Sequence, residues 1–133
     1  MSCLFCDIIQ KRKEALIVYE DSAAVAVLDV FPRAKGHVLV LPRRHVETIL
    51  ELTDEEIGPL WQVVRNVIKL LEEKLTPQGF TIGINHGKVS GQAIEHLHIH
   101  IMPRYEGDEG GSLHSVVNAP GGESLEEVYK KLL

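Results

Sequence analysis

The sequence is poor in cysteine and aromatic residues and contains no long apolar run. Its 133 residues include two cysteines, and aromatic side chains make up 5%. Two cysteines exclude a small domain held together by several disulfides. No stretch approaches the roughly 18 apolar residues of a membrane-spanning helix, so no membrane partner is expected. The residues after Met1 do not form a basic leader followed by an apolar segment, which predicts a cytoplasmic protein.

Positive charge is also scarce. Fourteen basic side chains against nineteen acidic ones give a formal net charge of -5, so a nucleic-acid partner is not expected. With 44% hydrophobic and 25% charged residues, the composition is that of an ordinary globular protein. The length fits a single domain over residues 1–133.

The two cysteines, Cys3 and Cys6, stand too close together for a useful disulfide, because a bridge would close a tiny loop. Such a Cys-x-x-Cys pair can supply half of a metal site, act in redox chemistry or serve as two small buried hydrophobes. Redox chemistry usually needs a βα unit around the pair, which the sequence does not predict here. Metal binding is therefore the preferred interpretation, and no redox cofactor is expected.

The first part of the chain predicts one helix and three strands. Apolar residues at helical spacing predict a short helix from Cys3 to Lys11. Runs rich in Val and Leu predict strands over Leu16–Tyr19, Ala23–Asp29 and His37–Leu41. The last two should pair antiparallel, since Pro and Gly punctuate the connection between them.

A long amphipathic helix should follow. Thr53 and Glu56 have the spacing of a capping box, and apolar residues recur at helical spacing as far as Leu75. Pro59 lies beyond the first turn of a helix begun at Thr53. Either the helix kinks there or it begins at Gly58.

The remaining sequence predicts two more strands and a last helix. Strands are expected over Phe80–Ile84 and Ile94–Met102, with Pro103 ending the second. The glycine-rich segment Glu106–Gly122 should be mobile, and a helix should begin at Ser124. Strands and helices do not alternate regularly, which predicts an α+β domain with one long and two short helices on a five-stranded antiparallel sheet.

Three histidines alternate with apolar residues in the run His96-Leu97-His98-Ile99-His100. Because successive side chains of a strand point to opposite faces, the imidazoles should share one face. Neighbouring histidines would then stand about 6.6 Å apart, too far for all three to bind one metal without bending. Polar residues on a solvent-facing strand are the plain alternative, but strict alternation with apolar residues favours a functional role.

A row of imidazoles suits chemistry on phosphorus. A neutral imidazole is a good nucleophile near neutral pH, because its pKa of about 6.5 leaves a lone pair free. The attacking nitrogen must be unprotonated, so the other nitrogen of His98 should donate to a backbone carbonyl or a carboxylate. Neighbouring imidazoles can then stabilise the phosphoryl oxygens.

The histidine run resembles the signature of the histidine triad family of nucleotide hydrolases and transferases, His-φ-His-φ-His-φ-φ with φ apolar. Residues His96–Met102 match it in full. The likeness extends upstream to Leu28–Pro32 and Lys35–Pro42, and Asn85 and Gly91-Gln92 precede the triad as in many members. Several motifs in the right order make the resemblance more specific than a triad alone.

The resemblance implies a fold in which the sheets of two subunits meet, giving a homodimer with two nucleotide sites. It implies that His98 attacks the α-phosphorus and forms a covalent nucleotidyl-histidine that water then opens. His100 and His37 would bind phosphate oxygens, and Asn85 and Gln92 would hold the phosphate or the leaving group, although Asn85 could equally be a turn residue after a strand.

The resemblance also implies a place for the nucleoside. Asp29 would accept hydrogen bonds from ribose hydroxyls, although a turn role is an equal alternative. The base pocket would be lined by four apolar residues that could equally belong to the core: Phe5, Ile8, Val30 and Leu39. Ala93 departs from members with Ser or Thr there, whose hydroxyl can protonate the leaving group. The leaving-group preference of those members therefore cannot be assumed for this sequence.

A zinc site is implied as well. Several microbial members carry Cys-x-x-Cys near the start, a histidine after the third strand and the first triad histidine, which here are Cys3, Cys6, His45 and His96. Such a Cys₂His₂ set suits structural zinc with no open position. His86 and His114 match no motif and are expected at the surface.

The expected function is cleavage of a purine nucleotide substrate at its α-phosphate. Nucleoside phosphoramidates and dinucleoside polyphosphates both remain open as substrates. Two other functions remain open too. One is a hydrolase in which His96 or His98, with His100, holds an open metal that activates water. The other is a sensor or adaptor that binds nucleotides with negligible turnover.

Overall fold

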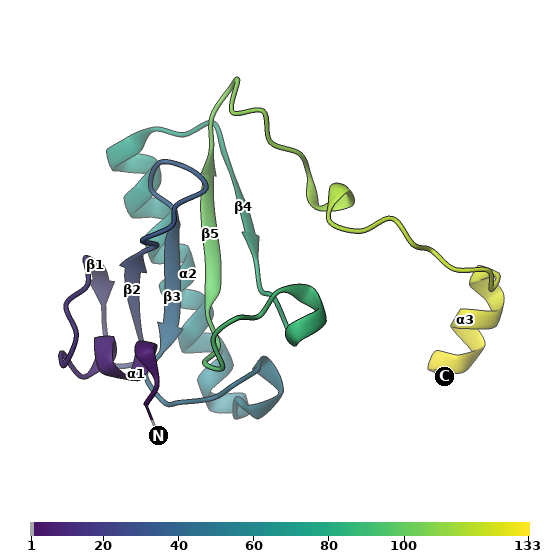
Figure 1. Cartoon of the computed structure of the whole chain (residues 1–133), viewed down its shortest axis with the longest axis horizontal. Helices are drawn as coiled ribbons and strands as arrows, with labels where there is room; N and C mark the ends of the chain where they lie inside the picture. Colours follow the sequence, from purple (N-terminus) through teal and green to yellow (C-terminus); the bar gives the residue numbers. More distant parts are fainter. Residues whose placement is uncertain (1) are drawn as a thin grey trace.

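The computed structural model describes residues 2–133 and contains one five-stranded sheet (Figure 1). The strands are β1 (Ile17–Glu20), β2 (Ala24–Leu28), β3 (Val38–Pro42), β4 (Gly79–Gly83) and β5 (Ile99–Arg104). They lie in the order β1-β2-β3-β5-β4, and every neighbouring pair is antiparallel. The predicted α+β domain is confirmed, including the pairing of the second and third strands.

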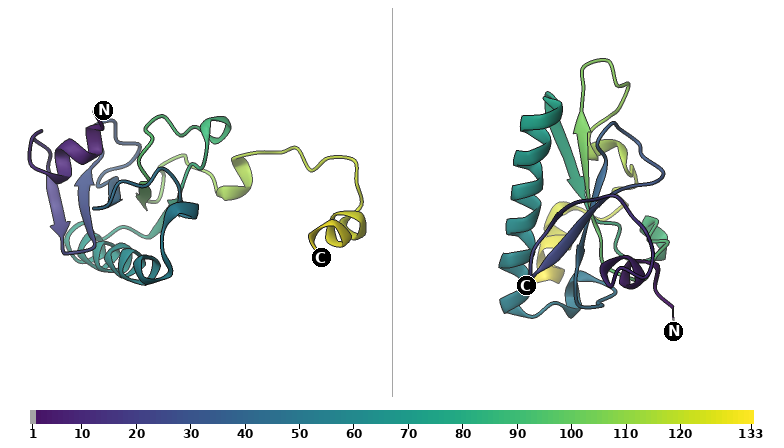
Figure 2. Two further views of the ribbon diagram at one scale, coloured as in Figure 1. Left: turned by 90° about the horizontal axis from the view of Figure 1, so that it is seen from below. Right: turned by 90° about the vertical axis from the view of Figure 1, so that its left-hand side faces the viewer.

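Helices lie on both sides of the sheet. They are α1 (Leu4–Ile9), α2 (Asp54–Leu75) and α3 (Leu125–Leu132). The right-hand view of Figure 2 shows α2 along one face of the sheet and α1 on the other side. Three short 3-10 turns, which the sequence patterns did not predict, lie at Ile49–Glu51, Lys88–Ser90 and Leu113–Ser115. Helix α1 ends before the predicted Lys11, because that residue adopts a left-handed φ of 62°.

Alternate residues of the central strands pack into two separate hydrophobic cores, one on each face of the sheet. The core under α2 includes Ala26, Val40 and Ile101 from the sheet, and the core under α1 includes Leu39. Leu39 is the cross-strand neighbour of His100. Paired residues of an antiparallel ladder share a face, so His100 lies on the α1 face of the sheet.

The long helix begins at Asp54 and runs through Pro59. The N–H of Thr53 donates to the Glu56 carboxylate at 2.9 Å, which is one of the two bonds of a capping box. Since Pro59 lacks an N–H, the helix loses one bond to the carbonyl of Glu55, and the rest of the ladder continues. The alternative start at Gly58 is therefore wrong.

The fifth strand begins later than predicted. Its ladder pairing starts at Ile99, so His96 and His98 precede β5 and only His100 lies within it. The predicted strand Ile94–Met102, with all three histidines on one pleated face, is therefore wrong at its start. The alternation of apolar residues along this segment does not show where the neighbouring strands begin to pair with it, and this pairing decides where β5 starts.

The same strand also continues past Pro103 to Arg104. Pro103 lies opposite Phe80 of β4. On the other side of β5 the pairing with β3 ends at Ile101, so the missing N–H of Pro103 has no ladder bond to make there. The predicted stop at Pro103 is wrong for this reason.

After β5 the chain leaves the sheet, and Figure 1 shows α3 standing apart from the body. All residues from Glu106 to Leu133 are exposed. Helix α3 begins as predicted, with the N–H of Glu127 donating to the Ser124 hydroxyl at 3.1 Å. Within residues 2–133 we find no helix with the length and apolar character needed to cross a bilayer.

Candidate active site and metal centre

Three histidines converge on the α1 face of the sheet. His37 comes just before β3 and His100 lies in the adjacent β5, which brings His37 Nε2 and His100 Nδ1 to 3.0 Å. The ring centroid of His98 lies 5.1 Å from that of His100. His37 and His98 are buried, at 2% and 9% exposure. The three residues that the motif singled out for phosphorus chemistry thus form one cluster.

The ring of His98 is held by the backbone. Its Nδ1 lies 2.7 Å from the carbonyl oxygen of His96, and because a carbonyl only accepts, Nδ1 carries the proton. A neutral ring has one N–H, so Nε2 keeps a free lone pair. This is the tautomer that the sequence argument requires of a nucleophile. Phe5 of α1 packs edge-on against the ring, with centroids 5.1 Å apart.

A chain of hydrogen bonds fixes the protons of the other two imidazoles. The backbone N–H of Arg33 donates to His37 Nδ1 at 3.1 Å. The proton of His37 therefore sits on Nε2, which donates to His100 Nδ1 at 3.0 Å. His100 must then carry its proton on Nε2, a buried nitrogen with no hydrogen-bond partner among residues 2–133. Such an N–H donor can bind an anionic oxygen.

The surroundings keep these two imidazoles neutral. Burial, together with the neighbouring His98 and His37, lowers the pKa of His100 to about 4. Burial also lowers the pKa of His37, although the Asp29 carboxylate opposes this. At neutral pH both rings therefore interact through N–H dipoles rather than through full positive charge.

Asp29 stands beside the histidine chain. Its Oδ2 lies 3.5 Å from His37 Nε2, and its Oδ1 accepts the N–H of Phe31 at 2.8 Å. The second bond is the turn role that the sequence left as an alternative to ribose binding. Carboxylate oxygens keep further lone pairs, so Asp29 can still accept from a ligand hydroxyl.

Asn85 and Gln92 differ in how free their side chains are. Asn85 lines a cavity that also contains His37 and His100. The amide of Gln92 donates to the carbonyls of Glu47 and Ile94, at 2.8 and 3.2 Å. Both N–H groups of the Gln92 amide therefore already donate hydrogen bonds within the loop. Gln92 would have to break one of these bonds to donate to a phosphate.

The four residues expected in a base pocket occupy two places. Phe5, Ile8 and Leu39 belong to the core under α1, with at most 8% exposure for any member of that core. Val30 is 80% exposed and lines, with residues 11–17, a hollow of about 660 Å³. Three of the four therefore have a packing role, and Val30 alone borders open space.

A second cluster lies at the other end of the histidine row. One ligating atom from each of four residues falls within 4.8 Å of the others, in the set Cys3, Cys6, His45 and His96. His96 Nε2 donates to the carbonyl of Pro42 at 2.9 Å, so the lone pair of Nδ1 is available on the opposite side of the ring. That Nδ1 lies 3.4 Å from Cys3 Sγ and 3.5 Å from Cys6 Sγ. These four residues could hold a metal ion.

The spacing of this cluster fits tetrahedral zinc. With bonds of about 2.3 Å to sulfur and about 2.0 Å to nitrogen, tetrahedral ligands stand roughly 3.3–3.8 Å apart. The separations of Cys6 Sγ and His96 Nδ1 from His45 Nδ1 are 3.3 and 3.2 Å. Burial and the adjacent Cys3 thiol raise the pKa of Cys6 to about 11, so a dication would have to displace the thiol proton.

Asp29, His37 and His100 also bring ligating atoms within 4.8 Å of one another. Their hydrogen bonds argue against a metal ion there. Because His37 Nδ1 accepts from the backbone N–H of Arg33, Nε2 holds the ring proton and has no lone pair to offer. This arrangement speaks against an open catalytic metal bound by His100 and His37.

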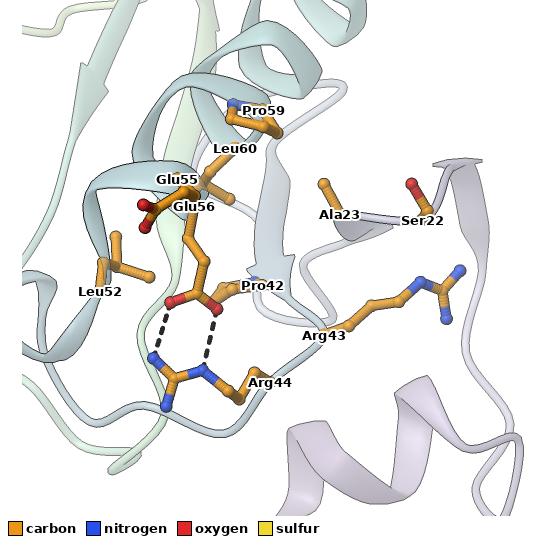
Figure 3. A pocket seen from close by; sticks show the side chains of 10 residues that line it. All are labelled: Ser22, Ala23, Pro42, Arg43, Arg44, Leu52, Glu55, Glu56, Pro59 and Leu60. Atoms are coloured by element: carbon orange, nitrogen blue, oxygen red, sulfur yellow. Dashed lines mark hydrogen bonds and ion pairs between the residues drawn. The ribbon is translucent and has the colours of Figure 1, made fainter.

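A hollow of about 350 Å³ lies between Pro42–Arg44 and the start of α2. Figure 3 shows Arg44 paired with Glu56 at this hollow, while Arg43 points away from that pair. Arg44 lies 2.7 Å from Glu56, and Arg43 lies 3.0 Å from Glu20. Both guanidinium groups are already paired and no triad residue lines the hollow, so it gains no role in phosphate chemistry.

A larger cavity of about 640 Å³ adjoins His37 and His100. Its outer wall comes from the segment that the sequence predicts to be mobile. Arg104 and Asp108, which the sequence analysis missed, lie 2.7 Å apart and both line the cavity. Opposite charges four residues apart are the only sequence signal for this pair, and that spacing is normally interpreted as a helical contact.

His86 and His114 are exposed, as predicted. The antiparallel sheet, the histidine cluster and the adjoining Cys₂His₂ cluster together define the class of histidine triad proteins. A family model for the HIT domain matches residues 10–107. The chain belongs to the HIT family.

Relatives and solved structures agree with this assignment. The chain is 42% identical over 127 residues to a HIT-like protein of Methanocaldococcus jannaschii, covering 95% of this chain and 98% of that one. It is 33% identical to the adenosine 5'-monophosphoramidase of Schizosaccharomyces pombe, over 78% of this chain and 75% of that one.

Among solved structures, a HIT family member from Bacillus subtilis superposes with a TM-score of 0.85 at 32% identity, covering 99% of this chain and 95% of that one. A zinc-bound histidine triad family protein from Mycobacterium smegmatis superposes with a TM-score of 0.77 at 34% identity, covering 82% and 79%. These superpositions confirm the fold of the single chain that the resemblance implies.

Proposed function

We propose that the protein is an enzyme that cleaves nucleotides at the α-phosphate by transferring the nucleotidyl group through His98 to water. The hydrogen bond from His98 Nδ1 to the His96 carbonyl, at 2.7 Å, carries this proposal. It leaves Nε2 unprotonated and therefore nucleophilic. The name of the Schizosaccharomyces pombe relative favours an adenosine phosphoramidate as substrate.

The reaction has two steps. In the first, the lone pair of His98 Nε2 forms a bond to phosphorus, and the leaving group departs with the electron pair of its own bond to phosphorus. The leaving group takes a proton from water, because Ala93 has no hydroxyl to supply one. In the second step, water attacks phosphorus and loses a proton to the solvent, which replaces the proton that the leaving group took in the first step. The N–P bond breaks, and the imidazole regains its lone pair.

His100 and His37 stabilise the phosphoryl group. The Nε2–H of His100, which has no hydrogen-bond partner in the described part of the chain (residues 2–133), donates to a phosphate oxygen. His37 holds His100 in the required tautomer through the 3.0 Å bond between them. Asn85 adds a second donor from the same cavity. Oriented donors of this kind stabilise charge that develops in the transition state.

The nucleoside lies on the Asp29 side of the triad. Asp29 accepts from the ribose hydroxyls with the lone pairs that its turn bond leaves free. The purine base enters the hollow that Val30 borders, and Phe5, Ile8 and Leu39 support that site from the core beneath α1.

The Cys₂His₂ cluster binds a structural zinc ion. The spacing of its four ligating atoms and the zinc-bound relative from Mycobacterium smegmatis support this assignment. Zinc would tie α1, which carries Cys6, to the segment of His96. With four protein ligands the ion has no open position, so it does not activate water.

The protein forms a homodimer. Strand β4 is at the edge of the sheet, and an edge strand offers unpaired backbone groups to a second copy. Light scattering of the protein in solution should then give about twice the 14.8 kDa of one chain. A mass equal to one chain would contradict this part of the proposal.

A rapid-quench experiment tests the proposed chemistry. Wild-type protein mixed with an adenosine phosphoramidate and quenched within milliseconds should yield, by mass spectrometry, a protein carrying one adenylyl group. The His98→Ala variant should form no adduct and should lose at least roughly 10³-fold in kcat, while nucleotide affinity changes little. His86→Ala, at an exposed residue outside the cluster, is the matched control.

Steady turnover without an adduct, or normal turnover by the His98→Ala variant, would contradict the mechanism. Tight nucleotide binding by wild-type protein without turnover of any phosphoramidate or dinucleoside polyphosphate would instead favour a nucleotide sensor.

A further inference from the structure

The connection between β2 and β3 decides which nitrogens of the histidine cluster carry protons. It contains Arg33, whose backbone N–H donates to His37 Nδ1 at 3.1 Å and so places the ring proton of His37 on Nε2. If this donor moved away, the proton could shift to Nδ1, and His37 Nε2 would then accept from His100 rather than donate to it. The Nε2 of His100 would lose its N–H, which is the group that binds an anionic oxygen.

Most hydrogen bonds of this connection stay within it. The N–H of Phe31 donates to Asp29 Oδ1 at 2.8 Å. The N–H of Asp29 donates to the His37 carbonyl at 2.9 Å and closes the base. Residues 30–33 are exposed. An exposed segment held only by its own bonds would open at low cost, so the position of the Arg33 N–H needs support from elsewhere.

That support comes from Tyr105, the first residue after β5. Its hydroxyl donates to the Lys35 carbonyl at 3.0 Å. Within residues 2–133, this is the only hydrogen bond that joins residues 30–36 to a part of the chain outside residues 29–37. Figure 1 shows the connection next to the end of β5 that leads to the C-terminal segment. The Lys35 ammonium lies 6.0 Å from the ring centroid of Tyr105, at the limit of a cation–π contact, so the hydroxyl bond is the stronger of the two.

Tyr105 is itself fixed to the sheet. It is half-buried, and its backbone N–H donates to Asp108 Oδ2 at 3.1 Å while its carbonyl accepts the N–H of Asp108 at 3.1 Å. Arg104, the last residue of β5, donates to the same carboxylate oxygen at 2.7 Å. A fixed backbone and partial burial leave the short side chain of a tyrosine little freedom. The hydroxyl is therefore a stable point of attachment for the connection.

We propose that Tyr105 is a positioning residue that holds the β2–β3 connection in place through its hydroxyl. The held connection keeps the Arg33 N–H on His37, and His37 then directs its own Nε2–H to His100. His100 is left with its Nε2–H to donate to a phosphate oxygen. The consequence for catalysis rests on the proposed function of His98, whereas the effect on the ring protons can be observed without turnover.

The Tyr105→Phe variant removes the hydroxyl and keeps the ring. With an adenosine phosphoramidate, kcat should fall about fivefold, which corresponds to the net contribution of one neutral hydrogen bond, and KM should change less than about twofold. The loss falls on kcat because an N–H donor at His100 stabilises charge that develops in the transition state.

Nuclear magnetic resonance of the imidazole nitrogens tests the ring protons directly. In nitrogen-labelled wild-type protein, two-bond proton–nitrogen spectra should show His37 and His100 protonated at Nε2. In Tyr105→Phe, a fraction of His37 should instead carry its proton on Nδ1. A residue with only a general structural role would not shift this equilibrium.

Tyr19→Phe is the matched control. The Tyr19 hydroxyl accepts the side-chain amide of Asn66 at 3.0 Å, and Tyr19 is half-buried as Tyr105 is, but it packs against the core under α2. This variant loses a comparable hydrogen bond away from the cluster, so its kcat and its ring protons should stay those of wild-type protein. Lys35→Ala should also have little effect, because the carbonyl that accepts the Tyr105 hydroxyl belongs to the backbone.

Tyr105→Phe with the kcat and ring protons of Tyr19→Phe would overturn the inference. So would an equal loss of kcat in both variants, or a loss of kcat in Tyr105→Phe without a change at His37. If wild-type protein turns over no nucleotide, the proposed function fails, and the spectra alone then decide whether Tyr105 sets the tautomer of His37.

Discussion

His96 and His98 are two residues apart, yet their rings are prepared for different chemistry. In His96 the ring Nε2–H donates to the backbone carbonyl of Pro42, and the lone pair of Nδ1 faces the cysteines. In His98 the ring Nδ1–H donates to the carbonyl of His96, and Nε2 keeps the lone pair. The ring nitrogen that donates to a carbonyl leaves the other nitrogen with the lone pair, and this separates the metal ligand proposed at His96 from the nucleophile proposed at His98.

In the proposed function, this difference divides the histidine row into a metal end and a phosphate end. The metal end, at His96, connects to α1 and to the loop that carries His45. The phosphate end, at His98 and His100, depends on hydrogen bonds to His37 and the backbone. We therefore expect perturbations of the metal end to change stability most, and perturbations of the phosphate end to change catalysis most.

Metal removal should have the largest effect on stability. Protein purified without chelator should contain about one zinc ion per chain, and Cys3→Ser or chelation should lower the melting temperature strongly. Structural zinc contributes on the order of 10 kcal/mol to folding in small domains. Turnover per folded molecule should change far less, because the lone pair of His98 does not face the metal cluster.

Leu4→Ala is the control for Cys3→Ser, because Leu4 is the next residue and is partly exposed, at 40%. Elemental analysis and thermal unfolding of the two variants check the prediction. Purified protein without metal, or a Cys3→Ser variant as stable as Leu4→Ala, would remove the distinction between the two ends.

Acid should weaken the phosphate end by a smaller amount. His100 titrates at about 4 in the folded protein against 6.5 ordinarily, so between these pH values the unfolded chain binds more protons. The free energy of unfolding should therefore be constant above about pH 6.5 and fall toward pH 4, by less than about 3 kcal/mol from this group, because solvent screens a ring that is only half-buried. Burial of His37 and His96 acts in the same direction.

Urea denaturation at pH 7.5 and pH 4.5 measures this effect. The loss on acidification should be smaller in His100→Gln than in wild-type protein, because the variant lacks the titrating ring and keeps the metal ligands. An identical loss in both proteins would show that His100 does not contribute.

The smallest expected change in stability comes from the turn at Gly36, which precedes His37 and positions it. Gly36 has a φ of +88°, and a Cβ there would lie 2.5 Å from Leu75 Cδ1 and 3.3 Å from Pro103 Cγ. Gly36→Ala should therefore cost about 1–2 kcal/mol of stability. Gly58→Ala in α2, where a Cβ meets nothing within 4 Å, should be neutral or stabilise by up to about 1 kcal/mol. Chemical denaturation compares them, and equal effects would contradict the argument.

The sequence predicted the elements well where local signals were strong. The capping spacing of Thr53 and Glu56 marks the true start of α2 despite Pro59, and Ser124 marks the start of α3. The predicted end of the fifth strand at Pro103 was wrong, because a strand tolerates proline where the neighbouring strand no longer pairs with it. The end of that pairing is set by β3, which lies far from Pro103 in the sequence.

The sequence predicted which residues form the two clusters of the candidate site, but not the wall of the cavity beside them. The triad motif and the Cys-x-x-Cys pair named the residues of both clusters. The wall at Arg104 and Asp108 was not predicted, since its glycines and small polar residues are typical of a mobile segment. An ion pair that spans a turn leaves no periodic pattern in a sequence.

By itself, the sequence determined the family, the order of strands and helices along the chain, and the side chains available for metal and phosphorus chemistry. The tertiary structure alone decided which nitrogen of each imidazole is free and which segment closes the cavity beside His100. The physical reason is that a ring proton is set by the acceptor within about 3 Å. For His96 that acceptor, the carbonyl of Pro42, is brought to 2.9 Å only by folding.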